Sequence, residues 1–184
     1  PYIEGRNVSF DVAKKFLVGY NKDNKTITFP VWDENNHLVM ITERSINEKK
    51  FYIPKGIEKP VYLLNYCEQM NLKTVAVVEG QIDALVAWSY GLPAIALFGS
   101  GTTQKQMNII NKSNIRNFIL MYDNDEAGRN GARKFKKMID KNRIITDIIM
   151  PIGIDVADCS RQDFYNILYK NDLLFLVNNY LTNN

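Results

Sequence analysis

The sequence predicts an α/β protein: a parallel β-sheet flanked by helices, with a smaller N-terminal α+β lobe. From Lys73 onward, apolar segments such as TVAVV, PAIAL and NFILM alternate with helical patterns. Continuous apolar runs that alternate with helices are typical of strands covered on both faces of a parallel sheet. Before Lys73, two β-rich runs, KTITFPVW and HLVMITER, flank the turn-forming DENN, which predicts a hairpin.

The N-terminal lobe should also contain helices. The segment from Ser9 to Leu17 begins with a capping-type serine and spaces its apolar residues at helical intervals. KKFYI is a candidate third strand, and the segment from Leu63 to Met70 is a candidate connecting helix. We therefore divide the chain into an N-terminal α+β lobe (1–72), an α/β domain of about four strands (73–150), and a final acidic loop with C-terminal helices (151–184).

The composition is that of an ordinary folded protein, with 46% hydrophobic and 23% charged residues among 184. No apolar run approaches the roughly 20 residues of a membrane-spanning helix, and no signal-peptide pattern opens the chain, so we expect a cytoplasmic protein without a membrane partner. Cys67 and Cys159 lack a second Cys or a His at ligand spacing, which argues against zinc and against a disulfide framework. The net charge of +3 permits a polyanionic partner without requiring one.

Acidic side chains follow three of the predicted strands. Because the carboxyl ends of parallel strands meet at one edge, where ligands bind, we expect these side chains to gather there. Clustered carboxylates raise one another's pKa unless a cation neutralises them. An all-oxygen site of this kind suits Mg²⁺, with Mn²⁺ as a substitute, and can serve phosphoryl or nucleotidyl transfer. The candidate metal ligands are Glu79, Asp83, Asp123, Asp125, Asp155 and Asp158.

Each of these carboxylates, taken alone, could instead be a helix cap or a turn residue. Agreement between three strand ends is harder to explain in that way, although Asp83 and Asp158 are the weakest members of the set. The glycine-rich FGSGTT after the second strand could bind a phosphate through backbone N–H groups. It lacks the lysine of a P-loop, so a plain strand-to-helix turn is the favoured interpretation.

Two motifs resemble the Toprim domain: the Glu-Gly of VVEGQIDAL after the first strand, and the Asp-x-Asp of YDNDEAG after a later one. The resemblance extends to the DnaG-type primase core of bacteria and phages, and it covers the chain from Tyr2 to about Ser160. YIEGRNVS, FLVGY, TITFPVWDENNHLVMITER, IALFGSGTT and GIDVAD are similar to motifs of that family in the same order. Asn7, Ile154 and Val156 depart from the Gly, Lys and Pro found there, which affects the expected loop geometry.

The resemblance implies a Toprim-type sheet and a DNA primase core, a metal-dependent nucleotidyltransferase that makes short RNA primers on single-stranded DNA from ribonucleoside triphosphates. It implies a bacterial cell or a phage-infected cell as the location. Glu79, Asp123 and Asp125 would be the catalytic carboxylates and principal metal ligands. Recognition of a start site and docking to a replicative helicase would need regions outside this chain. The residues implied in nucleotide or template binding are Arg6, Arg44, Lys50, and Lys55 or Lys59.

A basic segment follows the second acidic motif. Between Arg129 and Arg143 there are seven basic side chains and one acid, Asp140. A nucleic-acid backbone could run along the predicted helix, held through phosphates and therefore weakened by salt, whereas the alternative is a solvated helix face. The candidate backbone contacts are Arg129, Arg133, Lys134 and Lys137.

Other functions stay open at this stage. A Toprim-type nuclease or a topoisomerase fragment would use the same Glu and Asp residues to cleave phosphodiesters, although no candidate domain carries an attacking tyrosine and the N-terminal lobe resembles primases. A phosphatase built on Asp-x-Asp should carry that pair after its first strand, whereas here the pair comes late. A non-catalytic nucleic-acid-binding protein would have no need for the full set of carboxylates.

Overall fold

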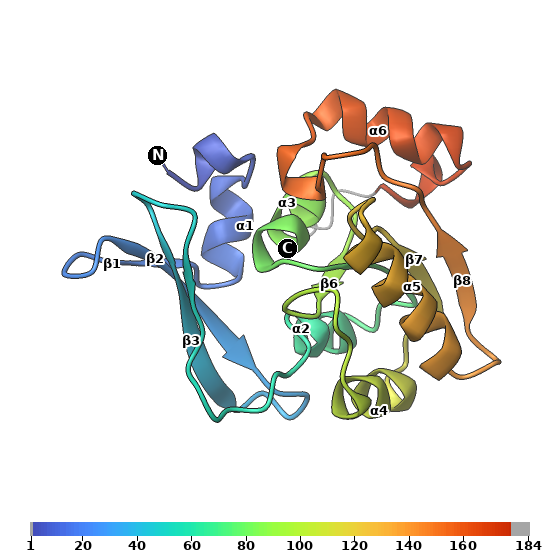
Figure 1. Cartoon of the computed structure of the whole chain (residues 1–184), viewed down its shortest axis with the longest axis horizontal. Coiled ribbons are helices and arrows are strands. Elements are labelled where there is room, and N and C mark those ends of the chain that lie inside the picture. Colours follow the sequence, from blue (N-terminus) through green and yellow to red (C-terminus); the bar gives the residue numbers. More distant parts are fainter. Residues whose placement is uncertain (1, 178–184) are drawn as a thin grey trace.

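A computed structural model describes residues 2–177, and it contains two four-stranded sheets (Figure 1). The first sheet is antiparallel, in the order β1-β2-β3-β4. Its strands are β1 (Gly19–Asn21), β2 (Thr26–Trp32), β3 (Leu38–Ser45) and β4 (Phe51–Tyr52). Strands β2 and β3 form the predicted hairpin, and β4 is the predicted third strand. Strand β1 was not expected, because its three residues carry no clear alternation.

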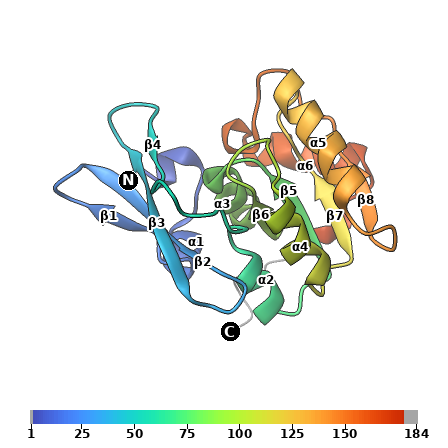
Figure 2. The same ribbon diagram turned by 60° about the horizontal axis from the view of Figure 1, so that its bottom comes forward.

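Short helices accompany this sheet: η1 (Glu4–Arg6), α1 (Phe10–Lys15) and α2 (Leu64–Gln69). Helix α1 begins as predicted, because the Ser9 side chain accepts a hydrogen bond from the backbone N–H of Val12. Helix α2 is the predicted connecting helix. Figure 2 shows that α1 and α3 lie between the antiparallel sheet and the second sheet.

The second sheet is parallel throughout, in the order β6-β5-β7-β8, and confirms the predicted α/β core. Its strands are β5 (Thr74–Val78), β6 (Ala94–Ala96), β7 (Asn117–Leu120) and β8 (Ile144–Asp147). Its helices are α3 (Gln81–Ser89), α4 (Gln104–Lys112) and α5 (Glu126–Met138). Right-handed crossovers place α3 on one face and α4 and α5 on the other. The apolar strands are buried because helices cover both faces.

The C-terminal part comprises η2 (Val156–Asp158), α6 (Arg161–Lys170) and η3 (Leu174–Leu176). Helix α6 packs near the end of α3, where the rings of Tyr90 and Phe164 lie 5.4 Å apart. The predicted last helix in LLFLVNNYL is described only as far as residue 177, and its remainder lies outside the described residues. Within residues 2–177, no helix has the length and apolar character needed to cross a bilayer.

The two sheets share one hydrophobic core. Phe16, after α1, meets the ring of Trp88 on α3 edge to face at 5.1 Å, and the Trp88 Nε1 donates to the carbonyl of Ala94 at 3.0 Å. Tyr62, just before α2, forms a backbone bridge with Ala96, the last residue of β6. The Phe16–Trp88 and Tyr62–Ala96 contacts cross the boundary and therefore hold the two lobes together.

Candidate active site

Glu79 and Asp123 follow neighbouring parallel strands. The chain leaves β5 toward β6 on one side and leaves β7 toward β8 on the other, so the strand order reverses between β5 and β7. Ligands of open α/β sheets bind at such a reversal, beyond the carboxyl ends of the strands. The backbone N–H of Asp123 donates to Oε1 of Glu79 at 3.3 Å, which places both carboxylates at this point.

Helix α5 lies unusually close to this edge because of its glycines. A Cβ atom at Gly128 would be 2.1 Å from the Asp123 carbonyl oxygen and 2.9 Å from Oε1 of Glu79. A Cβ at Gly131 would be 2.4 Å from the carbonyl oxygen of Ser100. Only glycine permits this approach. These residues were missed from the sequence, although glycines three residues apart inside a helical pattern are a signal for close packing.

Three of the predicted ligands also have structural hydrogen bonds. Asp125 is the N-cap of α5 and accepts from the N–H of Gly128 at 2.7 Å. Asp83 accepts from Gly80 and from Ala157, each at 3.0 Å, and so ties α3 to η2. Asp155 caps η2 by accepting from the N–H of Asp158 at 2.8 Å. The capping alternative therefore describes part of what these carboxylates do.

Burial and neighbouring carboxylates raise the pKa values of three carboxyl groups in the site, Glu79, Asp83 and Asp123. Burial raises the pKa of Glu79 to about 7, and repulsion from Asp123 adds to the rise. Burial also raises the pKa of Asp83 to about 7, with a further contribution from Asp155. The pKa of Asp123 is raised by burial and then by Asp155 and Asp125, while Lys49 opposes the rise. Near neutral pH, Glu79 and Asp83 are therefore partly protonated without a cation.

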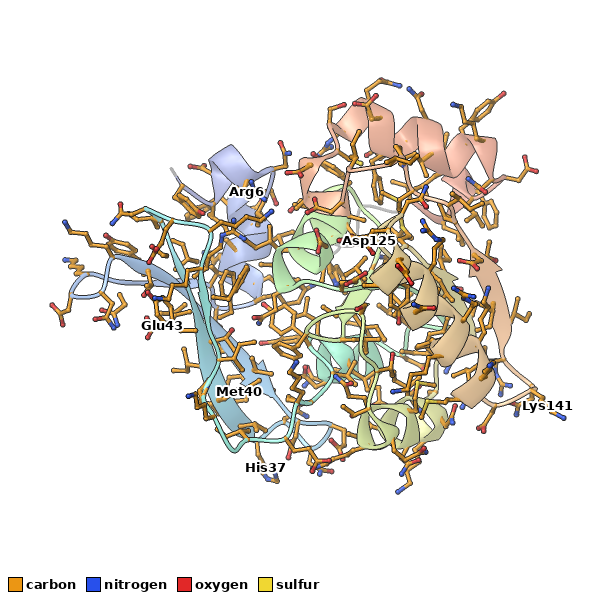
Figure 3. All side chains as sticks on the ribbon, in the orientation of Figure 1. Arg6, His37, Met40, Glu43, Asp125 and Lys141 are labelled. Atoms are coloured by element: carbon orange, nitrogen blue, oxygen red, sulfur yellow. The ribbon has the colours of Figure 1, made fainter. Side chains whose placement is uncertain are left out.

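A cleft of about 330 Å³ separates the carboxylates from basic residues of the N-terminal lobe. Glu79, Asp83, Asp123 and Asp155 line one side, and basic residues line the other. Figure 3 shows Arg6 on the N-terminal lobe and Asp125 at the start of α5. The basic lining residues are Arg6, Arg44 and Lys49.

The two guanidinium groups are held in place by packing. Arg44 is only 7% exposed; its Nε donates to the Tyr2 hydroxyl at 3.0 Å, and its guanidinium lies 4.8 Å from the centre of the Phe51 ring. An Arg6 nitrogen lies 3.6 Å from a carboxylate oxygen of Asp158. Both predicted arginines therefore reach the cleft, and Asp158 lies beside Arg6 instead of lining the cleft.

The predicted lysines are placed differently. The Nζ of Lys50 lies 4.0 Å from Glu48 and 4.9 Å from the Tyr52 ring, and Lys50 does not line the cleft. Its neighbour Lys49, in the bend between β3 and β4, does line the cleft. Lys59 donates to the carbonyl of Phe98 at 3.0 Å and anchors the turn after β6. Lys55 is exposed and outside the lining.

The basic segment after the site is only partly helical. Helix α5 ends at Met138, so Lys141 and Arg143 lie beyond it, and the expectation of one continuous basic helix is wrong. Figure 3 shows Lys141 at the far edge of the molecule from Arg6. Arg143 instead donates to main-chain carbonyls, including that of Ser113 at 3.0 Å. Arg129 and Arg133 line a groove beside β8, whereas Lys134 and Lys137 are exposed outside it.

The glycine-rich turn FGSGTT is a plain strand-to-helix connection. Thr103 and Gln106 form a capping box at the start of α4 and satisfy the helix terminus internally. The turn contributes Phe98 and Gly99 to the cleft lining.

A divalent ion fits this site only with help from other ligands. Among the residues that the structure describes, no group of three or more His, Cys, Asp or Glu side chains could by itself hold a metal ion. The six predicted ligands are thus not gathered into one coordination sphere. Mg²⁺ commonly takes one or two carboxylates and completes its shell with substrate phosphates and water. Glu79 and Asp123, whose pKa values are raised first by burial and then by neighbouring carboxylates, fit that role.

Comparison with known proteins agrees with the geometry. Residues 76–160 match the family described as Toprim-like. The matched segment runs from β5 to the residue before α6. The parallel sheet and its acidic edge therefore define a Toprim-like domain. The chain as a whole has the fold of the DnaG-type primase catalytic core with its Toprim domain, as the sequence resemblance predicts. A DnaG primase catalytic domain solved with single-stranded DNA matches with a TM-score of 0.76, at 20% identity, over 92% of this chain and 70% of that one.

Two sequence relatives are similar over most of the chain. The uncharacterized protein MG010 of Mycoplasma genitalium is 26% identical over 140 residues, which cover 72% of this chain and 63% of that protein. The DNA primase of Buchnera aphidicola is 27% identical over 170 residues, covering 78% of this chain and 27% of the primase. The chain thus spans about a quarter of the Buchnera primase and less than two thirds of the Mycoplasma protein.

Proposed function

We propose that this chain is the catalytic core of a DNA primase, which joins ribonucleoside triphosphates into short RNA primers on single-stranded DNA. The observation that carries the proposal is the cleft in which the carboxylates of Glu79 and Asp123 face Arg6, Arg44 and Lys49. The similarity to DNA primases and to a primase domain bound to single-stranded DNA supports it. The protein would act in the cytoplasm of a bacterial or phage-infected cell, and a helicase would dock through regions outside this chain.

Each wall of the cleft would have its own task. The guanidinium groups of Arg6 and Arg44 and the ammonium of Lys49 would neutralise triphosphate or template phosphates, an interaction that is strong in a partly buried site. Glu79 and Asp123 would hold Mg²⁺, or Mn²⁺ in its place. The ion, when bound, would supply activation of the attacking hydroxyl and charge stabilisation for the leaving pyrophosphate. Glu79 would also assist proton transfer from the attacking hydroxyl.

The test is incubation with single-stranded DNA, labelled ribonucleotides and Mg²⁺ or Mn²⁺. We expect short RNA from the parent chain, and a loss on the order of a hundredfold or more for Asp123→Asn. Asp140→Asn, which makes the same change on an exposed side chain after α5, is the matched control and should leave synthesis unchanged.

Two results would overturn the proposal. If the parent chain cleaved DNA and made no RNA, and if the cleavage disappeared in Glu79→Gln, the protein would be a Toprim-type nuclease. DNA binding with neither synthesis nor cleavage, under conditions that support primer synthesis by a known primase, would identify a non-catalytic nucleic-acid-binding protein.

A further inference from the structure

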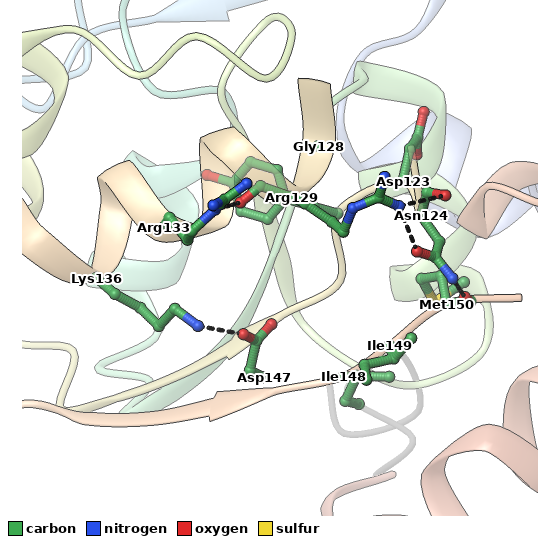
Figure 4. A pocket seen from close by; sticks show the side chains of 11 residues that line it. Asp123, Asn124, Gly128, Arg129, Arg133, Lys136, Asp147, Ile148, Ile149 and Met150 are labelled. Carbon is green, nitrogen blue, oxygen red and sulfur yellow. Dashed lines mark hydrogen bonds and ion pairs between the residues drawn. The ribbon is translucent and has the colours of Figure 1, made fainter. Parts of the chain in front are cut away.

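A second hollow, of about 450 Å³, lies beside the active site between α5 and the chain that follows β8 (Figure 4). We call it the α5 groove. Its helical wall carries Arg129, Arg133 and Lys136, which are four and three residues apart and therefore share one face of the helix. Its opposite wall is the apolar segment 148–150, in which Ile149 is 82% exposed.

The two arginines of the α5 groove have no anionic partner. Arg129 donates to the carbonyl and the side-chain oxygen of Asn124, at 3.2 and 3.0 Å. Arg133 donates to the Arg129 carbonyl at 3.2 Å and to the side chain of Asn130 at 2.8 Å. All of these acceptors are neutral, and within residues 2–177 neither guanidinium forms an ion pair. Lys136, in contrast, pairs with Asp147 across the groove (Figure 4).

The α5 groove is continuous with the active site. Asp123 lines both the groove and the cleft, so a chain that occupies the groove reaches the carboxylate edge directly. The basic residues lie in a row along the helix instead of converging on one point. At 1.5 Å per residue the row is roughly 10 Å long, which suits successive phosphates better than one compact phosphate group.

The lining also indicates how a strand would be held. Tyr122 is the aromatic residue of the lining, and it is buried, so it offers no open platform for base stacking. Non-specific grooves for single strands commonly combine basic residues with such platforms. Contact here would therefore be made through phosphates and through the sugars that meet Ile149.

We propose that the α5 groove binds the phosphate backbone of a single-stranded nucleic acid where it leaves the carboxylate edge, with Arg129 and Arg133 each contacting one phosphate. The assignment rests on the proposed function, because it gives the strand a path from the active site. It also separates the basic residues of α5 into two sets. Arg129 and Arg133 bind the strand, and Lys134 and Lys137 lie outside its path.

A charge-matched pair of variants tests this division. Binding of labelled single-stranded DNA and RNA is measured by fluorescence anisotropy over a salt series for Arg129→Gln/Arg133→Gln and for Lys134→Gln/Lys137→Gln. Each pair removes two positive charges from the same helix. The first should weaken binding on the order of tenfold at low salt and reduce the slope of log affinity against log salt by roughly 1.4, the value for two phosphates of a single strand. The second should change both quantities much less.

The outcomes separate the inference from the proposed function. Equal losses of strand affinity in the two double variants, or no loss in Arg129→Gln/Arg133→Gln, would overturn the assignment of the α5 groove even if the parent chain makes RNA. Binding of free ATP that is lost in the first pair, with strand binding unchanged, would overturn it in favour of a nucleotide site. Selective loss of strand binding in the first pair supports the groove even if RNA synthesis fails, in which case only the proposed function falls.

A cross-link locates the strand directly. Ile149→Cys places a thiol in the groove wall, and Ile152→Cys places one on the same loop outside the lining, at a similar exposure of 84% against 82%. The natural Cys67 and Cys159 are buried. An oligonucleotide with a disulfide-activated backbone should capture the Ile149→Cys variant at least severalfold faster than the Ile152→Cys variant. Equal rates would contradict the proposed path.

Discussion

The hydroxyl of Thr42 donates a 2.6 Å hydrogen bond to Oε1 of Gln81, and both side chains are buried. The bond joins strand β3 of the N-terminal lobe to the first residue of α3. Thr42 lies two residues before Arg44 on the same face of β3, and Gln81 lies two residues after Glu79. The Thr42–Gln81 hydrogen bond therefore fixes the position of the basic wall of the cleft relative to the carboxylate wall.

Thr42→Val should destabilise the fold by about 1–3 kcal/mol, because Oε1 of Gln81 would stay buried without a donor. The double variant Thr42→Val/Gln81→Leu should lose less than the sum of the two single variants, because it removes both polar partners. Urea unfolding of the four proteins gives this coupling. Strict additivity would show that the bond does not link the lobes.

Gly128→Ala should impair both folding and RNA synthesis. The new Cβ would be 2.1 Å from the Asp123 carbonyl oxygen, so α5 must move away from the carboxylate edge, at a cost of about 1–3 kcal/mol. Gly101→Ala is the control, since its Cβ would have no atom within 4 Å. Thermal unfolding and the synthesis assay measure the two effects, and equal behaviour of the two variants would contradict the close approach of α5.

The stability of the metal-free protein should fall as pH rises through about 7. The pKa of Glu79 is raised from 4.5 to about 7, so between these values the folded state binds more protons than the unfolded state. The stabilisation is present at low pH and is lost as the pH passes the folded-state value. Glu79→Gln should reduce the slope without removing it, because the pKa of Asp83 is also raised to about 7, whereas Asp23→Asn, on an exposed turn, should leave the slope unchanged. Unfolding at pH 5, 6, 7 and 8 gives the comparison; a profile that rises over this range in the parent would contradict the raised pKa.

Metal affinity should follow the opposite trend. Because Mn²⁺ must displace protons from carboxylates with raised pKa values, binding should strengthen between pH 6 and pH 8 and should release protons. Calorimetry in two buffers of different ionisation enthalpy counts those protons. Binding that does not depend on pH, or that is as tight in a Glu79→Gln/Asp123→Asn double variant, would remove these residues from the metal site.

The sequence predicts the α/β core, and the position of acidic residues after its strands, because both depend on local patterns. Apolar runs mark β5, β6 and β7 as strands covered on both faces, and acidic residues follow β5 and β7 directly. The structure adds that these two strands are neighbours, which brings Glu79 next to Asp123. Strand order is a long-range property that no local pattern contains.

Other features depend on side-chain direction and could not be predicted. The sequence resemblance implies Lys50, whereas the structure places its neighbour Lys49 in the cleft lining, because the bend before β4 sets the direction of each side chain. Asn7 stands where the DnaG family has glycine, yet it adopts the left-handed conformation with φ of 64°, which asparagine tolerates. Its side chain also donates to the carbonyl of Ala157 at 3.1 Å, so this departure preserves the loop.

Template dependence tests the central claim most directly. The chain is incubated with Mn²⁺ and either oligo(dT) or oligo(dC), and the incorporation of labelled ATP and GTP is measured on a sequencing gel. A primase core should polymerise ATP on oligo(dT) and GTP on oligo(dC), with neither product in Asp123→Asn. Incorporation that ignores the template, or labelled DNA that is cut while no ribonucleotide is joined, would contradict the assignment.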